Sequence, residues 1–282
     1  MRLNVIVFVL AGIVLATGCA MAQAPDGAGA PAKSAPSSPT PRGAGPSTAA
    51  KAPDLSPASP VDDILDALDA RGDDLRDFTA DVRLTETDTS TADERTRTGQ
   101  VWFQNLPDGG GRVRVTFDKL EEGERIKDDK IEYLLDGQWL TDRNYAKEQQ
   151  VRRQVLRPGE RINLLKLGEG PFPLPIGQDK SDVHNQFDVK KVDAAPAPAG
   201  TVRLQLIPRQ ETRLARRLAT IDVWVDTQTH MPRRIEVLDP NQTTVRTTDL
   251  THVKVNPGLS DPDFALPPIP ERWTQLEEAF EP

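Results

Sequence analysis

The sequence predicts a mainly β protein with some α structure (α+β), built on one strongly curved antiparallel sheet of about 11 strands. Apolar residues alternate with polar ones over most of residues 78–255, a period typical of strands with one buried face. No long helix separates these segments, so parallel crossover connections are not expected. One amphipathic helix precedes the first strand and must cover part of the sheet.

Residues 1–22 have the features of an export signal. About 15 apolar residues follow Arg2, whereas a transmembrane helix needs roughly 20. Two endings fit: a lipobox at Cys19, whose thiol would carry a diacylglyceryl group, or an A-x-A cleavage site before Gln23. Lipidation is the favoured interpretation, because the only cysteine follows a small residue at the end of the apolar run. In both cases the chain is exported, and is either periplasmic or anchored to the outer membrane by a lipidated N-terminus.

Residues 23–60 are rich in Pro, Ala, Gly and Ser and show no apolar period. Such a segment cannot bury enough surface to offset its ordering entropy. We expect a disordered tether, then a folded domain over residues 61–270 and a C-terminal tail over 271–282.

The domain is expected to begin with an amphipathic helix. Ser59 is the expected N-cap and Pro60 the expected first helical residue. Apolar residues then recur at helical spacing opposite a face of Asp and Arg. We predict that this stripe is one part of a lid over the sheet, contributed by Ile64, Leu65 and Leu68.

The strands follow with short turn sequences between them, such as Asp136-Gly137 and Asp239-Pro240-Asn241, as in an antiparallel meander. Because alternate residues share a face, one face is expected to be dry. The residues expected to line an apolar interior on that face are Val113, Val115, Phe117, Ile131, Tyr133, Leu135, Val223 and Val225.

Residues 157–185 interrupt the meander, because apolar side chains are crowded there among Gly and Pro. The segment is too interrupted for one helix and too apolar for a free loop. We expect short helical turns against the dry face, which complete the lid with Leu164, Leu165 and Phe172.

Composition argues against several classes of function. The formal charge is −8 and no long basic run is present, so no nucleic-acid partner is expected. One cysteine and three scattered histidines predict no metal site and no cofactor. No nucleophile elbow, phosphate loop or metalloprotease motif occurs, so an enzyme is not expected. Arginines at 152, 153, 157 and 161 either face water or mark an anionic partner.

A succession of short motifs resembles one known family. An amphipathic helix leads into FTADVRLTET, and the motifs after it are Gly99 to Phe103 (G-x-V-W-F), Leu106-Pro107, RVRVTF, Leu135 to Trp139 (L-D-G-x-W), Leu206 to Arg209 (LIPR) and Asp263 to Pro268 (DFALPP). This order resembles the outer-membrane lipoprotein-sorting carriers of the LolA type, whose relatives include the lipid-anchored receptor LolB. The resemblance covers about residues 61–270.

The resemblance implies an incomplete β-barrel with a helical lid, which encloses an apolar cavity for lipoprotein acyl chains. It implies a non-enzymatic envelope protein that binds lipid or an acylated lipoprotein in transport toward the outer membrane, and that contacts the membrane if Cys19 is modified. One departure is Leu106, where carriers have an arginine that helps to hold the lid. The alternative is a periplasmic sensor or envelope-assembly module that binds a peptide or partner domain through the same fold.

Overall fold

The computed structural model describes residues 54–107, 110–157, 159–160, 164, 176–193 and 198–280. The export signal, most of the tether and the prediction for Cys19 lie outside this part of the chain. The described residues form four helical segments: α1 (Val61–Asp74), α2 (Lys180–Gln186), the 3-10 turn η2 (Leu214–Arg216) and α3 (Asp261–Phe264). In this part of the chain, no helix is both long and apolar enough to span a membrane.

The strands belong to one twelve-stranded sheet in the order β12-β6-β5-β4-β3-β2-β1-β11-β10-β9-β8-β7. Every neighbouring pair is antiparallel except β12 with β6, which is parallel. The strands are β1 (Asp77–Asp88), β2 (Glu94–Asn105), β3 (Gly111–Glu122), β4 (Arg125–Asp136), β5 (Trp139–Asn144), β6 (Gln149–Gln154), β7 (Phe187–Lys191), β8 (Thr201–Pro208), β9 (Thr220–Asp226), β10 (Pro232–Leu238), β11 (Thr244–Val255) and β12 (Thr274–Glu278).

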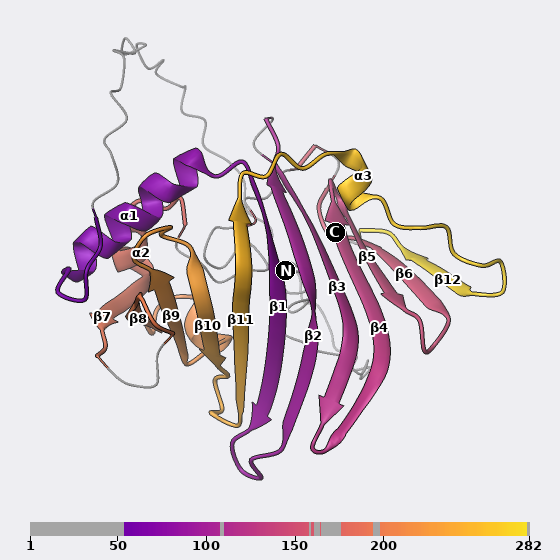
Figure 1. Cartoon of the computed structure of the whole chain (residues 1–282), viewed down its shortest axis with the longest axis horizontal. Helices are drawn as coiled ribbons and strands as arrows, with labels where there is room; N and C mark the ends of the chain where they lie inside the picture. The colour runs from indigo at the N-terminus through magenta and orange to yellow at the C-terminus, as the bar shows by residue number, and fades with distance from the viewer. Residues whose placement is uncertain are drawn as a thin grey trace, which may run out of the picture.

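The sheet is curved and unclosed, because its end strands β12 and β7 do not pair with one another in the order above. Figure 1 shows the strands fanning from β7 to β12, with α1 across the β7 end. Bulges add to the curvature. At the bulge near Gly99, a Cβ atom would lie 1.7 Å from the carbonyl oxygen of Thr116, so only glycine fits there. The prediction of a curved antiparallel sheet with helical cover is confirmed.

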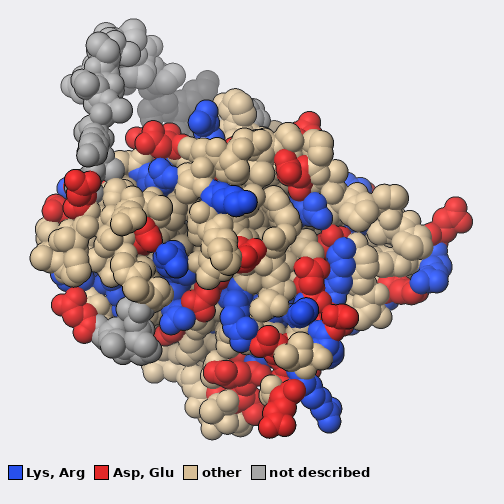
Figure 2. Space-filling view, viewed as in Figure 1, with Lys and Arg blue, Asp and Glu red and all other residues tan. Residues whose placement is uncertain are grey.

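Strand alternation gives the sheet two different faces. The inner face carries the hydrophobic core, in which Phe103, Phe117 and Leu204 are at most 1% exposed, together with residues of α1. The outer face carries polar and charged residues, including Glu132 and Asp222. On the side seen in Figure 2, acidic and basic side chains are interspersed rather than gathered into one patch.

The ends of the domain differ in detail from the sequence expectation. Helix α1 starts at Val61, with Pro60 as its N-cap and no side-chain cap; Ser59 instead accepts a hydrogen bond from the Ser56 amide at 3.0 Å. Leu55, assigned to the tether, is buried, so the last tether residues pack on the domain. Residues 274–278, assigned to a tail, form β12, which brings the sheet to twelve strands.

Candidate functional site

The predicted apolar residues of β3 and β4 face one another on the inner face. Cross-strand pairing places Val113 opposite Leu135, Val115 opposite Tyr133, and Phe117 opposite Ile131. Tyr133 is partly buried against the core, and the other five are at most 6% exposed. Five of these residues belong to the hydrophobic core or pack against it, and Ile131 pairs with Phe117 at its border.

Val223 and Val225 also lie on the inner face, but at the other end of the sheet. They belong to β9, and four strands, β2, β1, β11 and β10, separate β9 from β3. Buried apolar residues of the intervening strands fill the interval: Ala80, Val82, Val101, Phe103, Ile235 and Leu250. The apolar surface, called the apolar strip below, thus runs without interruption from β9 to β4.

Helix α1 supplies the predicted cover at the β7 end. Ile64, Leu65 and Leu68 are at most 1% exposed and share the core with the strands. The helix contacts α2 and the edge strand β7, so it lies over the Val223 end of the strip rather than over β3 and β4. Figure 1 shows this placement.

Of the three lid residues predicted within residues 157–185, Leu164 is the one that the structure describes. It is 1% exposed, and its side chain lies near Gly111, where an added Cβ atom would be 3.0 Å from the leucine Cδ1. Leu164 therefore covers the start of β3. Leu165 and Phe172 lie outside the described residues, so their part in a lid stays a prediction.

Two glycines join the pieces of the cover. The Gly177 amide donates to the Leu68 carbonyl oxygen at 3.1 Å, and a Cβ atom on Gly72 would lie 2.1 Å from the Gly177 Cα. Gly177 itself has a φ of +64°, which glycine adopts without strain. The backbone of α1 therefore touches the segment that leads into α2.

Exposed polar contacts add to this junction. The Lys180 ammonium lies 2.8 Å from the Asp66 carboxylate, and His184 Nε2 lies 3.1 Å from Asp62. Exposed pairs of this kind contribute little to stability, and here they link α2 to α1. Helix α1 and residues 176–186 thus form one cover, called the lid below.

A group of partly buried polar side chains borders the apolar strip toward β6. Asp142 pairs across the strands with Tyr133 and with Val151, so it shares the inner face. Arg153 lies 3.9 Å from Asp142. At the far end of the long hairpins, Arg97 forms an ion pair with Asp129 at 2.7 Å. These five residues, Arg97, Asp129, Tyr133, Asp142 and Arg153, are called the polar rim.

Burial changes the acidities of two rim groups. Burial, with the nearby Asp142 carboxylate, raises the pKa of Tyr133 to about 12, so its hydroxyl stays protonated at neutral pH. Burial also raises the pKa of Asp142, an effect that the nearby Arg153 and Lys147 oppose. Burial therefore disfavours the ionised forms of both Tyr133 and Asp142.

The sequence expectation contained Tyr133 but missed the other rim residues and the glycine junction. A signal was present for Asp142, which stands at an inward position of the alternating strand 139–144. No comparable signal marks Gly72 or Gly177, because the approach of two segments distant in sequence is a tertiary property. In the described part of the chain, no cluster of His, Cys, Asp or Glu could hold a metal ion.

No protein-family model and no curated protein matches the chain. Among solved structures, an uncharacterized conserved protein from Thermus thermophilus is 14% identical, with a TM-score of 0.44, covering 76% of this chain and 97% of that one. LprF from Mycobacterium bovis is 14% identical, with a TM-score of 0.37 and coverages of 74% and 95%. A putative outer membrane lipoprotein-sorting protein domain from Vibrio parahaemolyticus is 13% identical, with a TM-score of 0.34 and coverages of 71% and 94%. The solved structures to which this chain is similar thus include a putative lipoprotein-sorting domain.

Proposed function

We propose that the protein is an exported, non-enzymatic carrier or receptor that binds the acyl chain of a lipid or an acylated lipoprotein on the inner face of its sheet. The observation that supports this most is the continuous apolar strip from β9 to β4, which ends at the polar rim. An amphiphile needs both parts: apolar surface for its chain and polar partners where the chain ends.

The energetics of such binding are favourable. An acyl chain of roughly 16 carbons would contribute on the order of 10 kcal/mol on burial, before ordering costs are subtracted. Lid residues such as Leu65 and Leu68 would then exchange contacts with the sheet for contacts with the chain. Because apolar contacts have no directional requirement, this exchange leaves no polar group without a hydrogen-bond partner.

The position of the site in the cell is part of the same proposal. The export signal would carry the chain out of the cytoplasm, and a lipid on Cys19 would hold the domain at the outer membrane through the tether of residues 23–60. Under the alternative cleavage before Gln23, the same domain would act as a free periplasmic carrier.

The test compares two buried leucines. Leu204 in β8 and Leu68 in α1 are both 0% exposed. Leu204→Ala should lower the free energy of unfolding by about 2–5 kcal/mol, as for a fixed core residue. Leu68→Ala should lower it by less than about half as much, because a lid that opens belongs to the less stable part of a structure.

The same two variants and the parent chain are titrated with a fluorescent fatty acid. The parent should bind the probe, and Leu68→Ala should change its affinity several-fold. If no protein binds the probe and both substitutions destabilise equally, the interior is a filled core. The carrier proposal then fails, and the alternative, a periplasmic sensor or envelope-assembly module that binds a peptide or partner domain, becomes the better explanation.

A further inference from the structure

A C-terminal segment crosses the outer face of the sheet, opposite the lid. Residues 259–280, called the strap below, leave β11 and pass over β3, β4 and β5. They then join the sheet edge as β12, beside β6. Figure 1 shows α3 and β12 on this path. The strap covers polar strand residues rather than the hydrophobic core.

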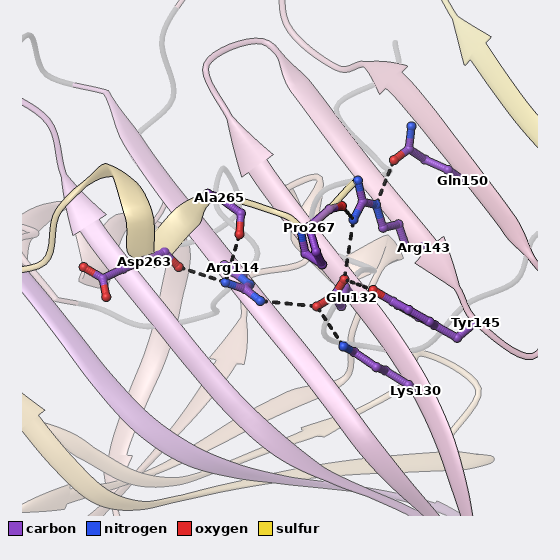
Figure 3. Close-up of polar contacts among 9 residues, drawn as sticks. All are labelled: Arg114, Lys130, Glu132, Arg143, Tyr145, Gln150, Asp263, Ala265 and Pro267. Atoms are coloured by element: carbon purple, nitrogen blue, oxygen red, sulfur yellow. Dashed lines mark hydrogen bonds and ion pairs between the residues drawn. The ribbon is translucent and has the colours of Figure 1, made fainter. Parts of the chain in front are cut away.

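Arginines of two strands hold the main chain of the strap (Figure 3). Arg114 on β3 donates to the carbonyl oxygens of Asp263 and Ala265 at 3.1 and 3.3 Å. Arg143 on β5 donates to the carbonyl oxygen of Pro267 at 2.6 Å. Asp263 lies in the helical turn α3 and Ala265 follows it in extended conformation, so the arginines bind the main chain where the helical turn ends.

The two arginines are held in place from below by Glu132 of β4. This carboxylate is 0% exposed; it accepts from Arg114 at 3.2 Å and from the Tyr145 hydroxyl at 2.7 Å. Arg143 Nη1 lies 3.8 Å from it and also has Gln150 as a partner, through Nε at 2.7 Å. These bonds lie within the sheet and the turn after β5, and none of them involves the strap. This part of the outer face is therefore pre-organised.

The strap presents two buried aromatic anchors to this surface. Partly exposed ion pairs accompany them: Asp261 with Arg112, Glu277 with Arg152, and Glu278 with Arg153. Phe264 is 2% exposed and lies under the Arg112 guanidinium at 4.1 Å. Trp273 is 7% exposed and packs edge-on against Tyr145 at 4.9 Å. Between these anchors every other residue is exposed or only partly buried, and the five residues of β12 are all exposed.

Proline content explains how such a segment is recognised. Positions 262, 267, 268 and 270 are proline, which lacks an amide hydrogen and favours extended backbone. A proline-containing segment offers carbonyl acceptors without matching donors, and the arginines supply donors only. One of the three carbonyl groups that the arginines bind belongs to a proline, Pro267.

We propose that the outer face of β3–β5 is a peptide-binding surface that the strap occupies from within the chain. Its partner is a proline-containing segment of another protein with aromatic anchors, which displaces the strap. The arginines and anchors of this surface lie on the outer face, so this proposal does not rest on acyl-chain binding. The strap meets the polar rim through Glu278, which accepts from Arg153 at 2.8 Å.

The experiment uses the full chain and a fluorescein-labelled synthetic peptide of residues 259–280, followed by fluorescence anisotropy. The parent chain should bind it weakly, because its own strap competes. A variant with Phe264→Ala and Trp273→Ala keeps the strap but lacks both anchors, and should bind at least tenfold more tightly. Adding Arg143→Ala to that variant should abolish binding, as should the same two alanines in the peptide.

Hydrogen exchange of the parent chain provides a second readout that does not depend on the anchor variant folding. The amides of residues 274–278 should exchange through a local opening, faster than those of β3 and β4, and excess unlabelled peptide should accelerate them. If these amides exchange only with global unfolding, or if a folded anchor variant binds no peptide, the strap is a permanent part of the fold and the proposal is wrong.

Discussion

The two faces of one sheet are covered in opposite ways. On the inner face, the lid meets the strands through buried apolar side chains such as Leu68. On the outer face, the strap meets them through arginine hydrogen bonds to its carbonyl groups, above a buried glutamate. Adjacent residues of β4 illustrate the contrast: Glu132 points outward into the charge network, and Tyr133 points inward to the rim.

The two covers differ in the structural changes that each can accept. Apolar contacts are non-directional, so a lid can shift or accept an inserted chain without leaving a polar group unpaired. Hydrogen bonds have defined geometry, so the outer surface accepts only a backbone of one shape in one register. Under the two proposals, the inner face would accept varied hydrophobic ligands, and the outer face one kind of peptide.

The largest expected effect follows from removing the charge beneath the strap. Glu132→Ala leaves Arg114 and Arg143 without the buried carboxylate that neutralises them. Breaking a buried ion pair from one side costs about 3–5 kcal/mol, and urea unfolding should show a loss of that size.

A matched control lies at the start of the strap. Asp261 also pairs with an arginine, Arg112 at 2.9 Å, but its side chain is 92% exposed. Asp261→Asn should therefore alter stability by less than about 0.5 kcal/mol. Equal effects of the two substitutions would show that the outer face does not depend on a buried charge network.

A smaller effect is expected from Tyr133 on the inner face, and only at alkaline pH. Burial first, and then Asp142, raise its pKa from 10.0 to about 12. A raised pKa stabilises the folded state below the unfolded pKa, and this contribution is lost as pH rises through the folded pKa. By about pH 11.5 the loss should reach about 2 kcal/mol.

The measurement is urea unfolding of the parent chain and Tyr133→Phe at about pH 9 and about pH 11.5. Other groups titrate in this range in both proteins, so only the difference between the two proteins reports on Tyr133. The parent should lose about 2 kcal/mol more than the variant. Equal losses would mean that the Tyr133 hydroxyl is well solvated and that the rim is open to water.

Much of the inner face was predictable from sequence because its signals are local. Alternation places Val113, Val115 and Phe117 on one side of a strand whatever the rest of the chain does. The stripe of α1 is likewise visible within a single helix.

The outer cover was not predictable in the same way. The strap depends on Arg114 and Arg143 meeting residues more than a hundred positions later, and in sequence those arginines look like the solvated side of a strand. The five exposed residues of β12 carry no apolar alternation, because β12 is held by main-chain pairing with β6. Residues 271–280 therefore resemble a tail until the fold is known.

The smallest expected effect is a gain in stability rather than a loss, and it concerns Asp142 in the rim. Burial raises its pKa, against the influence of Arg153 and Lys147. A carboxyl group whose folded pKa is raised destabilises the fold once it ionises, above the unfolded pKa of about 3.9. Asp142→Asn should therefore stabilise the protein at about pH 7, by less than about 1 kcal/mol, and the gain should vanish at about pH 3, where the aspartate is neutral in both states.

This gain in stability would distinguish a ligand-binding site from a structural core. A carboxylate kept at a destabilising position, next to an apolar strip, is expected where charge serves binding. The stabilised Asp142→Asn variant should then bind a fatty-acid probe with an altered affinity, while Asp249→Asn on the outer face, which removes an ion pair to Arg234, should leave probe binding unchanged. If Asp142→Asn gains stability and binds the probe as the parent does, the rim does not contact the ligand, and the polar end of the amphiphile must lie elsewhere along the strip.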